Sequence, residues 1–350
     1  MNFRECRQNS IYRILKILDN DLTIQKTFML LGGIRNGMYF LNYHGINLIG
    51  LSGCAEINCP GIFEILGVEF SCIQPDSFIQ LFHQANNKKN NIYIIPILRD
   101  MLNTDKVDLD KLLIIGHSYL VVKSIDEKRI YFDTLDDNDD YYLDIGVFNK
   151  MNNKSQWVIE SDFCVYEINI DKVSKNNKLE EFVNRSEKEL LYDNVHNFLK
   201  NEKATGDCGT VRMDGEQVYE IVENHLLNMR KNLELVKNTD KYDNFTKYIY
   251  LQLVNIRKHI AAGSDGYYRV EFCDVLSNCT NTKIEDNIKK WNCIVSNWRT
   301  MGRKLAQVTN MKYLEHNADE ALKNLIKSWN EIKHLEIGAM NELAGILTDP

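Results

Sequence analysis

The segment GHSYLVVKSIDEKRIYFDT, from Gly116 to Thr134, is the stretch that decides how the first half of the chain folds. Strand-forming residues run from Tyr119 to Val122 and again from Ile130 to Phe132, with a polar turn between them, which predicts a β-hairpin. His117 lies at the start of this hairpin and Asp133 near its end. A histidine held by a carboxylate on the neighbouring strand is suited to act as a general base.

The register of this hairpin decides whether His117 and Asp133 can meet, because only residues on the same face of a sheet lie side by side. A two-residue turn at 126–127 would place them on opposite faces. A three-residue loop at 125–127 would instead set Asp133 across from Tyr119, on the face of His117. We therefore predict an odd-length loop or a β-bulge at this turn.

Cys6 is the candidate nucleophile that would accompany this base. Apolar residues recur at helical spacing after it, at Ile11, Ile14, Leu15 and Leu18. The spacing predicts a helix over 6–19, with Cys6 at or just before its first turn, where unpaired backbone N–H groups stabilise a thiolate and can bind an oxyanion. Thiol attack on an acyl group requires a thiolate, a base and a group that orients the base, so Cys6, His117 and Asp133 form a candidate triad. The alternative is an incidental thiol, a histidine at a strand end and an aspartate that forms a turn.

Length and composition restrict the class of protein. The 350 residues suggest two domains, and a hydrophobic content of 44% is enough for a buried core. The net charge of -7 argues against a nucleic-acid-binding protein, which would usually carry a basic domain. Nine scattered cysteines, the lack of an N-terminal signal peptide and the lack of any apolar run of about 18 residues predict a cytoplasmic protein with reduced thiols and no membrane association.

The pattern along the chain predicts an α+β protein with two domains of different character, 1–172 and 177–350, separated by a polar stretch at 172–176. The first domain is expected to contain a helix at 74–85 and short strands at 38–43, 46–51, 92–98, 156–159 and 163–170. The second is expected to be almost wholly helical apart from a loop at 203–215. Its predicted helices are at about 177–201, 216–237, 241–261, 267–279, 283–306 and 316–346.

Several segments resemble the acyltransferase family of the butirosin biosynthesis enzyme. In the first half these are ECRQNSIYRILK at Glu5–Lys16, LLGGIRNGMYFLNY at Leu30–Tyr43 and the hairpin segment itself. In the second half, SDGYYRVEFCDVL at Ser264–Leu276 and KKWNCIVSNWRTMGRKL at Lys289–Leu305 resemble the helical region of the same family. One departure is Thr134, which stands where a proline is common.

The resemblance implies a papain-like, cysteine-protease-type catalytic domain at 1–172 and a mostly α-helical domain at 177–350 that contributes to the substrate pocket and to carrier docking. It implies transfer of an acyl chain from a carrier-protein thioester to Cys6, and from there to an amine acceptor such as a diamine, in nonribosomal natural-product biosynthesis. The expected partners are an acyl or peptidyl carrier protein and a small amine. No cofactor and no metal is expected, since phosphopantetheine arrives on the carrier, and the oligomeric state is open.

Five further residues are candidates for the oxyanion hole or the substrate pocket: Asn2, Gln8, Asp100, Tyr268 and Arg269. Papain places an upstream glutamine in its oxyanion hole, and we expect no counterpart in this chain, so Asn2 or Gln8 would act beside the backbone N–H of the nucleophile. Asp100 either lines the pocket or solvates the end of the strand before it. Tyr268 and Arg269 are expected to line the pocket from the second domain.

Two other functions remain open, a cysteine peptidase on the same fold and a non-catalytic binding module. A peptidase is disfavoured because we expect no pro-segment, transporter domain or secretion signal. The acidic loop at 133–144 is either solvated, a calcium loop that lacks the usual glycine and glutamate, or an attractor for a cationic diamine. Basic clusters at 257–259 and 299–304 are either carrier-docking patches or solvated helix faces.

Overall fold

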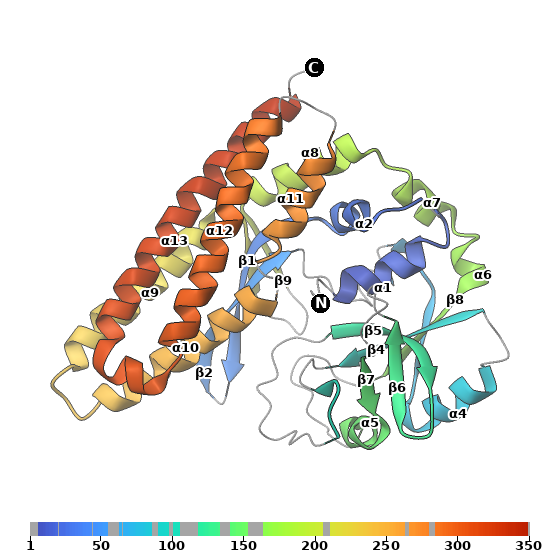
Figure 1. Cartoon of the computed structure of the whole chain (residues 1–350), viewed down its shortest axis with the longest axis horizontal. Helices are drawn as coiled ribbons and strands as arrows, with labels where there is room; N and C mark the ends of the chain where they lie inside the picture. The colour runs from blue at the N-terminus through green and yellow to red at the C-terminus, as the bar shows by residue number, and fades with distance from the viewer. Residues whose placement is uncertain are drawn as a thin grey trace. The chain divides into compact units, whose positions relative to one another are not determined.

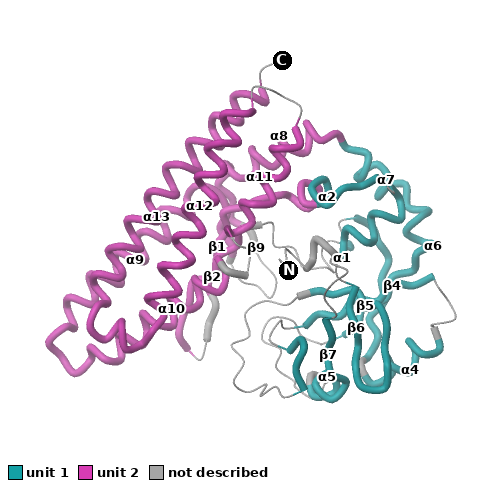
Figure 2. Tube along the Cα trace, viewed as in Figure 1, with its two compact units in different colours: residues 1, 3–27, 57–185 teal, residues 2, 28–56, 186–350 magenta. Residues whose placement is uncertain are grey.

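A computed structural model divides the chain into two compact units (Figures 1 and 2). Unit 1 comprises residues 1, 3–27 and 57–185, and unit 2 comprises residues 2, 28–56 and 186–350. The structure describes residues 6–19, 21–43, 45–54, 63–64, 66–85, 90–97, 101–105, 118–133, 141–152, 164–205, 211–262, 266–279 and 284–348.

Unit 1 is built on an antiparallel sheet with the strand order β3-β8-β4-β5-β6-β7. Its strands are β3 (Phe70–Ile73), β4 (Asn91–Ile97), β5 (Ser118–Ile125), β6 (Arg129–Asp133), β7 (Tyr142–Asp144) and β8 (Val165–Asn169). Its helices are α1 (Cys6–Leu15), α4 (Pro75–Ala85), α5 (Ile145–Asn152), α6 (Ile170–Val173) and α7 (Asn177–Val183), and α2 (Ile24–Leu30) runs from unit 1 into unit 2. The predicted helix at 74–85 and the strands at 92–98 and 163–170 are confirmed, whereas 156–159 lies outside the described residues.

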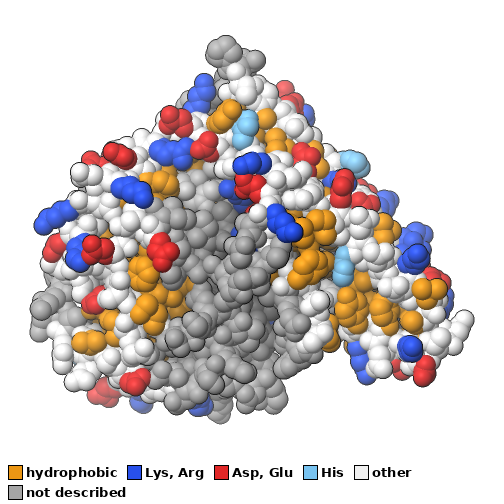
Figure 3. Space-filling model, turned by 180° about the vertical axis from the view of Figure 1, so that it is seen from behind, with side chains coloured by type: hydrophobic (Ala, Val, Ile, Leu, Met, Phe, Trp, Pro, Cys, Tyr) orange, Lys and Arg blue, Asp and Glu red, His pale blue; other side chains and the backbone are white. Residues whose placement is uncertain are grey.

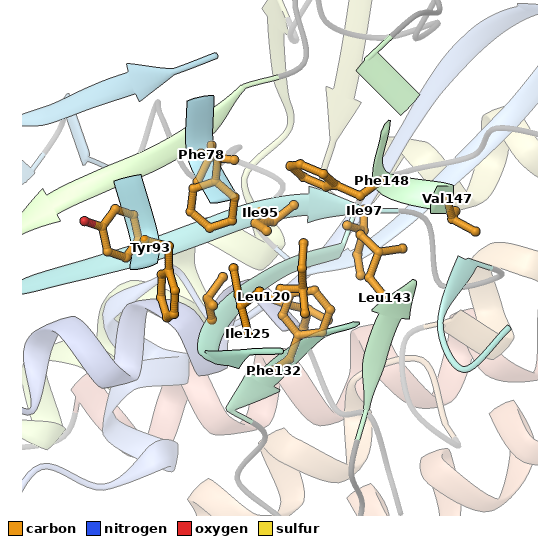
Figure 4. Packing of buried hydrophobic residues seen from close by; sticks show 14 of the residues in the cluster. Phe78, Tyr93, Ile95, Ile97, Leu120, Ile125, Phe132, Leu143, Val147 and Phe148 are labelled. Atoms are coloured by element: carbon orange, nitrogen blue, oxygen red, sulfur yellow. The ribbon is translucent and has the colours of Figure 1, made fainter. Parts of the chain in front are cut away.

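The core of unit 1 lies between one face of the sheet and helices α4 and α5 (Figure 4). Phe78 of α4 and Phe148 of α5 are fully buried, with ring centroids 5.9 Å apart. The central strands contribute alternate residues to this core, namely Ile95, Ile97, Leu120 and Val122. Burying each large apolar side chain stabilises the fold by roughly 1.5 to 3 kcal/mol, so this face sets the orientation of the sheet. Helix α1 packs against β5 on the opposite face (Figure 1).

The turn of the β5–β6 hairpin is shorter than predicted. Ile125 pairs with Ile130, and the Asp126 N–H donates to the Arg129 carbonyl at 3.0 Å, which leaves a two-residue turn. The Asp126 carboxylate accepts hydrogen bonds from the N–H groups of Lys128 and Arg129, and these bonds, the first above all, lower its pKa. The predicted three-residue loop is therefore wrong, because an aspartate that bonds backbone N–H groups two and three residues ahead closes a tighter turn.

The predicted β-bulge is present in β5, and it decides which residues of β5 share a face with Asp133. The register shifts at 122–124, so that Asp133 pairs with Val121, two residues further along β5 than expected. Phe132 belongs to the core beneath the sheet, and neighbouring residues of a strand point to opposite faces. Asp133 therefore lies on the face that α1 covers, together with Tyr119 and Val121, the odd-numbered residues of β5 that precede the bulge.

Unit 2 combines an antiparallel sheet, in the order β2-β1-β10-β9, with long helices. Its strands are β1 (Ile34–Tyr43), β2 (Ile46–Cys54), β9 (Glu202–Thr205) and β10 (Val211–Asp214). Its helices are α8 (Glu187–Leu199), α9 (Gln217–Val236), α10 (Tyr242–Ala262), α11 (Arg269–Asn278), α12 (Glu285–Val308) and α13 (Met311–Thr348). These bounds confirm the predicted helices within a few residues, except that 177–201 is divided between α7 and α8. With the sheets of both units, they also confirm the α+β class.

The two units do not follow the single boundary expected at 172–176. Residues 28–56 belong to unit 2 because β1 pairs with β10. In this pairing Gly37 lies opposite Asp214, although the two residues are separated in the sequence by about half the length of the chain. The predicted loop at 203–215 is wrong for its described residues, since β9 and β10 complete this sheet. Strand pairing between distant segments leaves no local signal, which is why periodicity assigned β1 and β2 to the first domain.

Helix α10 protects the free edge of β2. The Gln252 side chain accepts a hydrogen bond from the Ile49 N–H at 3.1 Å and donates to the Asn47 carbonyl at 2.6 Å. Asn255 donates to the Ile49 carbonyl at 2.6 Å. These amides satisfy the backbone groups that a neighbouring strand would otherwise bond. Among the described helices, none has both the length and the apolar character that crossing a bilayer demands.

Gly53, near the end of β2, is expected to tolerate no side chain. A Cβ atom at this position would lie 2.9 Å from the Tyr267 carbonyl oxygen and 2.7 Å from Tyr268 Cδ2. Gly53→Ala is expected to lower the free energy of unfolding by about 1 to 3 kcal/mol, because overpacking forces the neighbouring segment to move. Chemical denaturation followed by circular dichroism measures the change.

Gly338 supplies a matched control for this substitution. It lies inside α13, and a Cβ atom there would meet no heavy atom within 4 Å. Gly338→Ala is expected to raise the free energy of unfolding by roughly 0.5 to 1 kcal/mol, since alanine restricts the unfolded chain and favours the helix. If both variants unfolded like the wild type, the close approach at Gly53 would be contradicted.

Candidate functional site

Helix α1 is joined to both strands of the β5–β6 hairpin. Ser10 Oγ donates a buried hydrogen bond of 2.7 Å to the Tyr119 carbonyl of β5. Arg13 Nη2 donates to Asp133 Oδ1 of β6, also at 2.7 Å. With a helical step of about 100° per residue, positions 6, 10 and 13 fall within about 60° of one another. The side of α1 that carries Ser10 and Arg13 is therefore also the side on which Cys6 begins the helix.

Arg13 is the site residue that the sequence reasoning missed. Its side chain and that of Asp133 are 35% and 32% exposed, so the ion pair is half-buried. A guanidinium that binds one carboxylate oxygen restrains rotation of the whole carboxylate. The available signal was spacing, because Arg13 follows Cys6 by seven residues, or two helical turns, and so returns to the same side of the helix.

The structure locates only part of the predicted triad. Cys6 is the first residue of α1, as predicted, and Asp133 is the last residue of β6. His117 lies outside the described residues, as do the side chain of Cys6 and the distance between them. The described residue that follows His117 is Ser118, which begins β5.

The candidates for the oxyanion hole remain predictions. Asn2 lies outside the described residues, as does Asp100, the pocket candidate of the same domain. Gln8 lies in the first turn of α1, but its side chain is not among those described. The first turn of α1 provides backbone N–H groups without helical partners, which is where an oxyanion donor was expected.

Arg269 does not line a pocket, so that prediction is corrected. Its side chain is fully buried and forms an ion pair with Glu336 of α13, which is also fully buried. Its remaining nitrogen, Nη1, donates to the carbonyls of Arg35 and Gly53 at 3.1 Å and of Tyr267 at 3.0 Å. The guanidinium thus binds β1, the end of β2 and the segment before α11 to α13, which is a structural role.

Glu336 depends on this pairing for its charge. Burial raises the pKa of Glu336 well above its usual range. Two donors besides Arg269 favour the charged form, namely Trp298 Nε1 at 3.0 Å and the Tyr219 hydroxyl. The four elements that meet at this carboxylate, α9, α11, α12 and α13, are therefore held by one buried ionic network.

Tyr268 is half-buried, and its expected contact with substrate stays a prediction. Tyr267 and Tyr268 both have left-handed backbone conformations, with φ of 57° and 63°. Non-glycine residues in this region carry strain, and the close packing against Gly53 accompanies it. Tyr267, Trp291 and Trp298 are fully buried and belong to the core of unit 2.

The described cysteine side chains are reduced thiols, and they differ in exposure. Cys72 and Cys293 are exposed, and Cys164 is buried. Burial raises the pKa of Cys273 to about 12, and burial with the nearby Glu187 also raises the pKa of Cys279. The latter two thiols are therefore poor nucleophiles near neutral pH.

The two basic clusters are partly used in contacts within unit 2. Arg257 donates to Thr309 Oγ1 at 3.0 Å, and Lys304 donates to Ser328 Oγ at 2.6 Å. Burial, helped by Lys258, lowers the pKa of His259 to about 4, so this residue is neutral at pH 7. On the face shown in Figure 3, basic and acidic side chains are interspersed. Carrier docking at either cluster remains a prediction.

Comparison of the sequence with known proteins identifies no family for this chain. The sequence matches no protein-family model, and no curated protein is similar to it at a significant level. Among the described residues, no three His, Cys, Asp or Glu side chains lie close enough together to hold a metal ion.

Proposed function

We propose that the chain is an amide-forming acyltransferase in which Cys6 is the nucleophile, His117 the base and Asp133 the group that orients the base. The observation that best supports this is the attachment of α1 to the hairpin. Ser10 and Arg13 bind the helix that begins at Cys6 to both strands. The nucleophile's helix and the acidic residue thus belong to one rigidly bonded group of elements.

The proposed fold of this catalytic region is papain-like. A helix that begins at the nucleophilic cysteine and packs on an antiparallel sheet bearing the acid is consistent with that arrangement. The sequence resembles the butirosin-type acyltransferases in this region, and within that family it resembles the cysteine-protease-like enzyme that assembles the closthioamide chain. That resemblance favours a carrier-bound acyl chain as the donor and a diamine as the acceptor.

The proposed reaction has two steps. The Cys6 thiolate attacks the carbonyl carbon of a carrier thioester, the bond from this carbon to the phosphopantetheine sulfur breaks, and the departing thiolate takes a proton from His117. An amine then attacks the acyl-enzyme, His117 accepts a proton from it, and Cys6 leaves as thiolate. The sum is thioester plus amine to amide plus thiol. Because this exchange is downhill, it needs no nucleotide.

Selectivity for amine over water is the main demand on the site. Water would hydrolyse the acyl-enzyme to an acid, so the acceptor pocket has to exclude bulk solvent at the second step. A diamine is largely cationic near pH 7, and the attacking nitrogen has to lose a proton before it can act as a nucleophile. A base near the acyl-enzyme meets this requirement.

Intact mass spectrometry of the enzyme with an acyl-loaded carrier protein tests the proposal. We expect the protein's mass to rise by that of the acyl group, the adduct to map to Cys6, and a diamine to discharge it as the amide. Absence of any acyl adduct under conditions where the carrier stays loaded would contradict the proposal. Cleavage of a peptide panel without any carrier would instead indicate a peptidase.

A non-catalytic binding module is the second candidate, and one observation favours it. The ion pair with Arg13 gives Asp133 a structural partner that requires no catalysis. This reading predicts that Cys6 titrates near the unperturbed thiol value of about 8.5 and alkylates no faster than the exposed Cys72. The acyltransferase predicts a markedly lower pKa and selective alkylation of Cys6.

A further inference from the structure

We propose that Arg13 is a positioning residue of the triad, acting on Asp133 from the helix that carries the nucleophile; this inference rests on the proposed function. Arg13 Nη2 binds Asp133 Oδ1 at 2.7 Å. Because the two oxygens of a carboxylate are rigidly connected, holding Oδ1 also determines where Oδ2 points. Arg13 thereby sets the direction in which Asp133 can accept a further hydrogen bond.

Three features of the fold converge on this contact. The β-bulge at 122–124 shifts the first part of β5, against which α1 packs, so that Val121 pairs with Asp133 and the two share a face of the sheet. Ser10 fixes the distance between α1 and β5 through a buried bond to the Tyr119 carbonyl. Arg13 then lies one turn further along the same side of the helix, within reach of the last residue of β6.

The placement couples two members of the triad through one helix. Arg13 lies about 10 Å along the helix axis from Cys6, at about 1.5 Å per residue. A shift of α1 that moves Cys6 must also move Arg13, and so either carries Asp133 with it or breaks the ion pair. The positive charge of Arg13 also favours the ionised form of Asp133 and, more weakly at this distance, a thiolate at Cys6.

Arg13→Met and Arg13→Lys in the full chain test this role. The first readout is the pH dependence of Cys6 alkylation by iodoacetamide, followed by peptide mass spectrometry, which needs no carrier protein. We expect Arg13→Met to raise the apparent pKa of Cys6 by about 0.5 to 1 unit. We expect Arg13→Lys to restore most of the wild-type profile, because it keeps the charge.

The second readout is amide formation. We expect Arg13→Met to lower kcat by about 10-fold to 100-fold with little change in KM for the carrier, as small displacements of catalytic groups do. Arg129→Met is the matched control. Arg129 is exposed at the other end of β6, where its guanidinium carbon lies 4.0 Å from the centroid of the Tyr142 ring, so Arg129→Met removes an equal positive charge near the far end of the strand that carries Asp133.

The outcomes separate this inference from the proposed function. If Cys6 has a lowered pKa in the wild type and Arg13→Met leaves both its pH profile and kcat unchanged, the role of Arg13 is refuted and the acyltransferase stands. A lower thermal stability with an unchanged pH profile would likewise refute it, since that is the effect of a structural ion pair alone. If wild-type Cys6 titrates near 8.5, the proposed function fails, and this inference fails with it.

Discussion

Replacement of Cys6 by alanine is expected to lower the rate of amide formation from a carrier thioester by about 10³-fold or more. Without the thiolate there is no acyl-enzyme, and only substrate binding and oxyanion stabilisation remain to accelerate a direct attack by the amine. The measurement is single-turnover formation of amide, with the carrier thioester and the diamine both saturating. The intact mass of the variant is expected to show no acyl adduct.

Cys72→Ala is the matched control for this substitution. Cys72 is an exposed free thiol on the edge strand β3 of the same unit. Cys72→Ala therefore makes the same chemical change as Cys6→Ala, but at a position outside α1. We expect wild-type rates from this variant. Amide formation by Cys6→Ala at the wild-type rate would exclude covalent catalysis at Cys6, and with it the mechanism proposed above.

Glu336→Gln is expected to cause the largest loss of stability, about 3 to 5 kcal/mol. The substitution keeps the size of the side chain but leaves the Arg269 guanidinium fully buried without a counter-charge. Arginine cannot escape this by losing its proton. Urea denaturation monitored by the fluorescence of the buried tryptophans, among them Trp298 at this network, measures the effect.

Arg269→Met is expected to cost less, about 2 to 3 kcal/mol near pH 7, because Glu336 can take up a proton. Burial raises the pKa of Glu336 in the folded state above its value in the unfolded chain. The native state of this variant then binds more protons than the unfolded state, so its stability falls as the pH rises through the raised pKa. Relative to the wild type, Arg269→Met should therefore recover stability between pH 7 and pH 5.

The pair formed by Arg230 and Asp319 provides the control, since it also connects α9 to α13. Its side chains are 39% and 37% exposed, so solvent screens the interaction. Asp319→Asn is expected to cost no more than about 1 kcal/mol. If Glu336→Gln destabilised the protein as little as Asp319→Asn, the buried network would not be holding unit 2 together.

Local patterns predicted most of the secondary structure. Helices α9 to α12 begin and end within about two residues of their predicted bounds, because a repeating apolar face is written directly into the sequence. The last helix is longer than the predicted 316–346, but it has a non-helical residue at Asn317, next to the predicted start. The hairpin and the start of α1 at Cys6 were likewise local features.

The local sequence pattern predicted only part of the candidate site. Reasoning about the two faces of a strand predicted that a bulge or an odd loop was needed, and the structure contains the bulge. The structure has the bulge and not the odd-length loop because the Asp126 carboxylate bonds the N–H groups of Lys128 and Arg129 and so closes a two-residue turn. Arg13 and Asp133 are 120 residues apart, and no periodicity relates them.

The sequence by itself determined the α+β class, the succession of helices in the second half and the start of the first helix at Cys6, because these depend on residues within a few turns of one another. Only the tertiary structure decided that β1 and β2 join β10 in unit 2, that Arg269 is buried against Glu336 and that Arg13 binds Asp133. Each of these joins segments far apart in the chain. Such contacts are selected by the complementarity of whole surfaces and by the cost of leaving charges and strand edges unpaired.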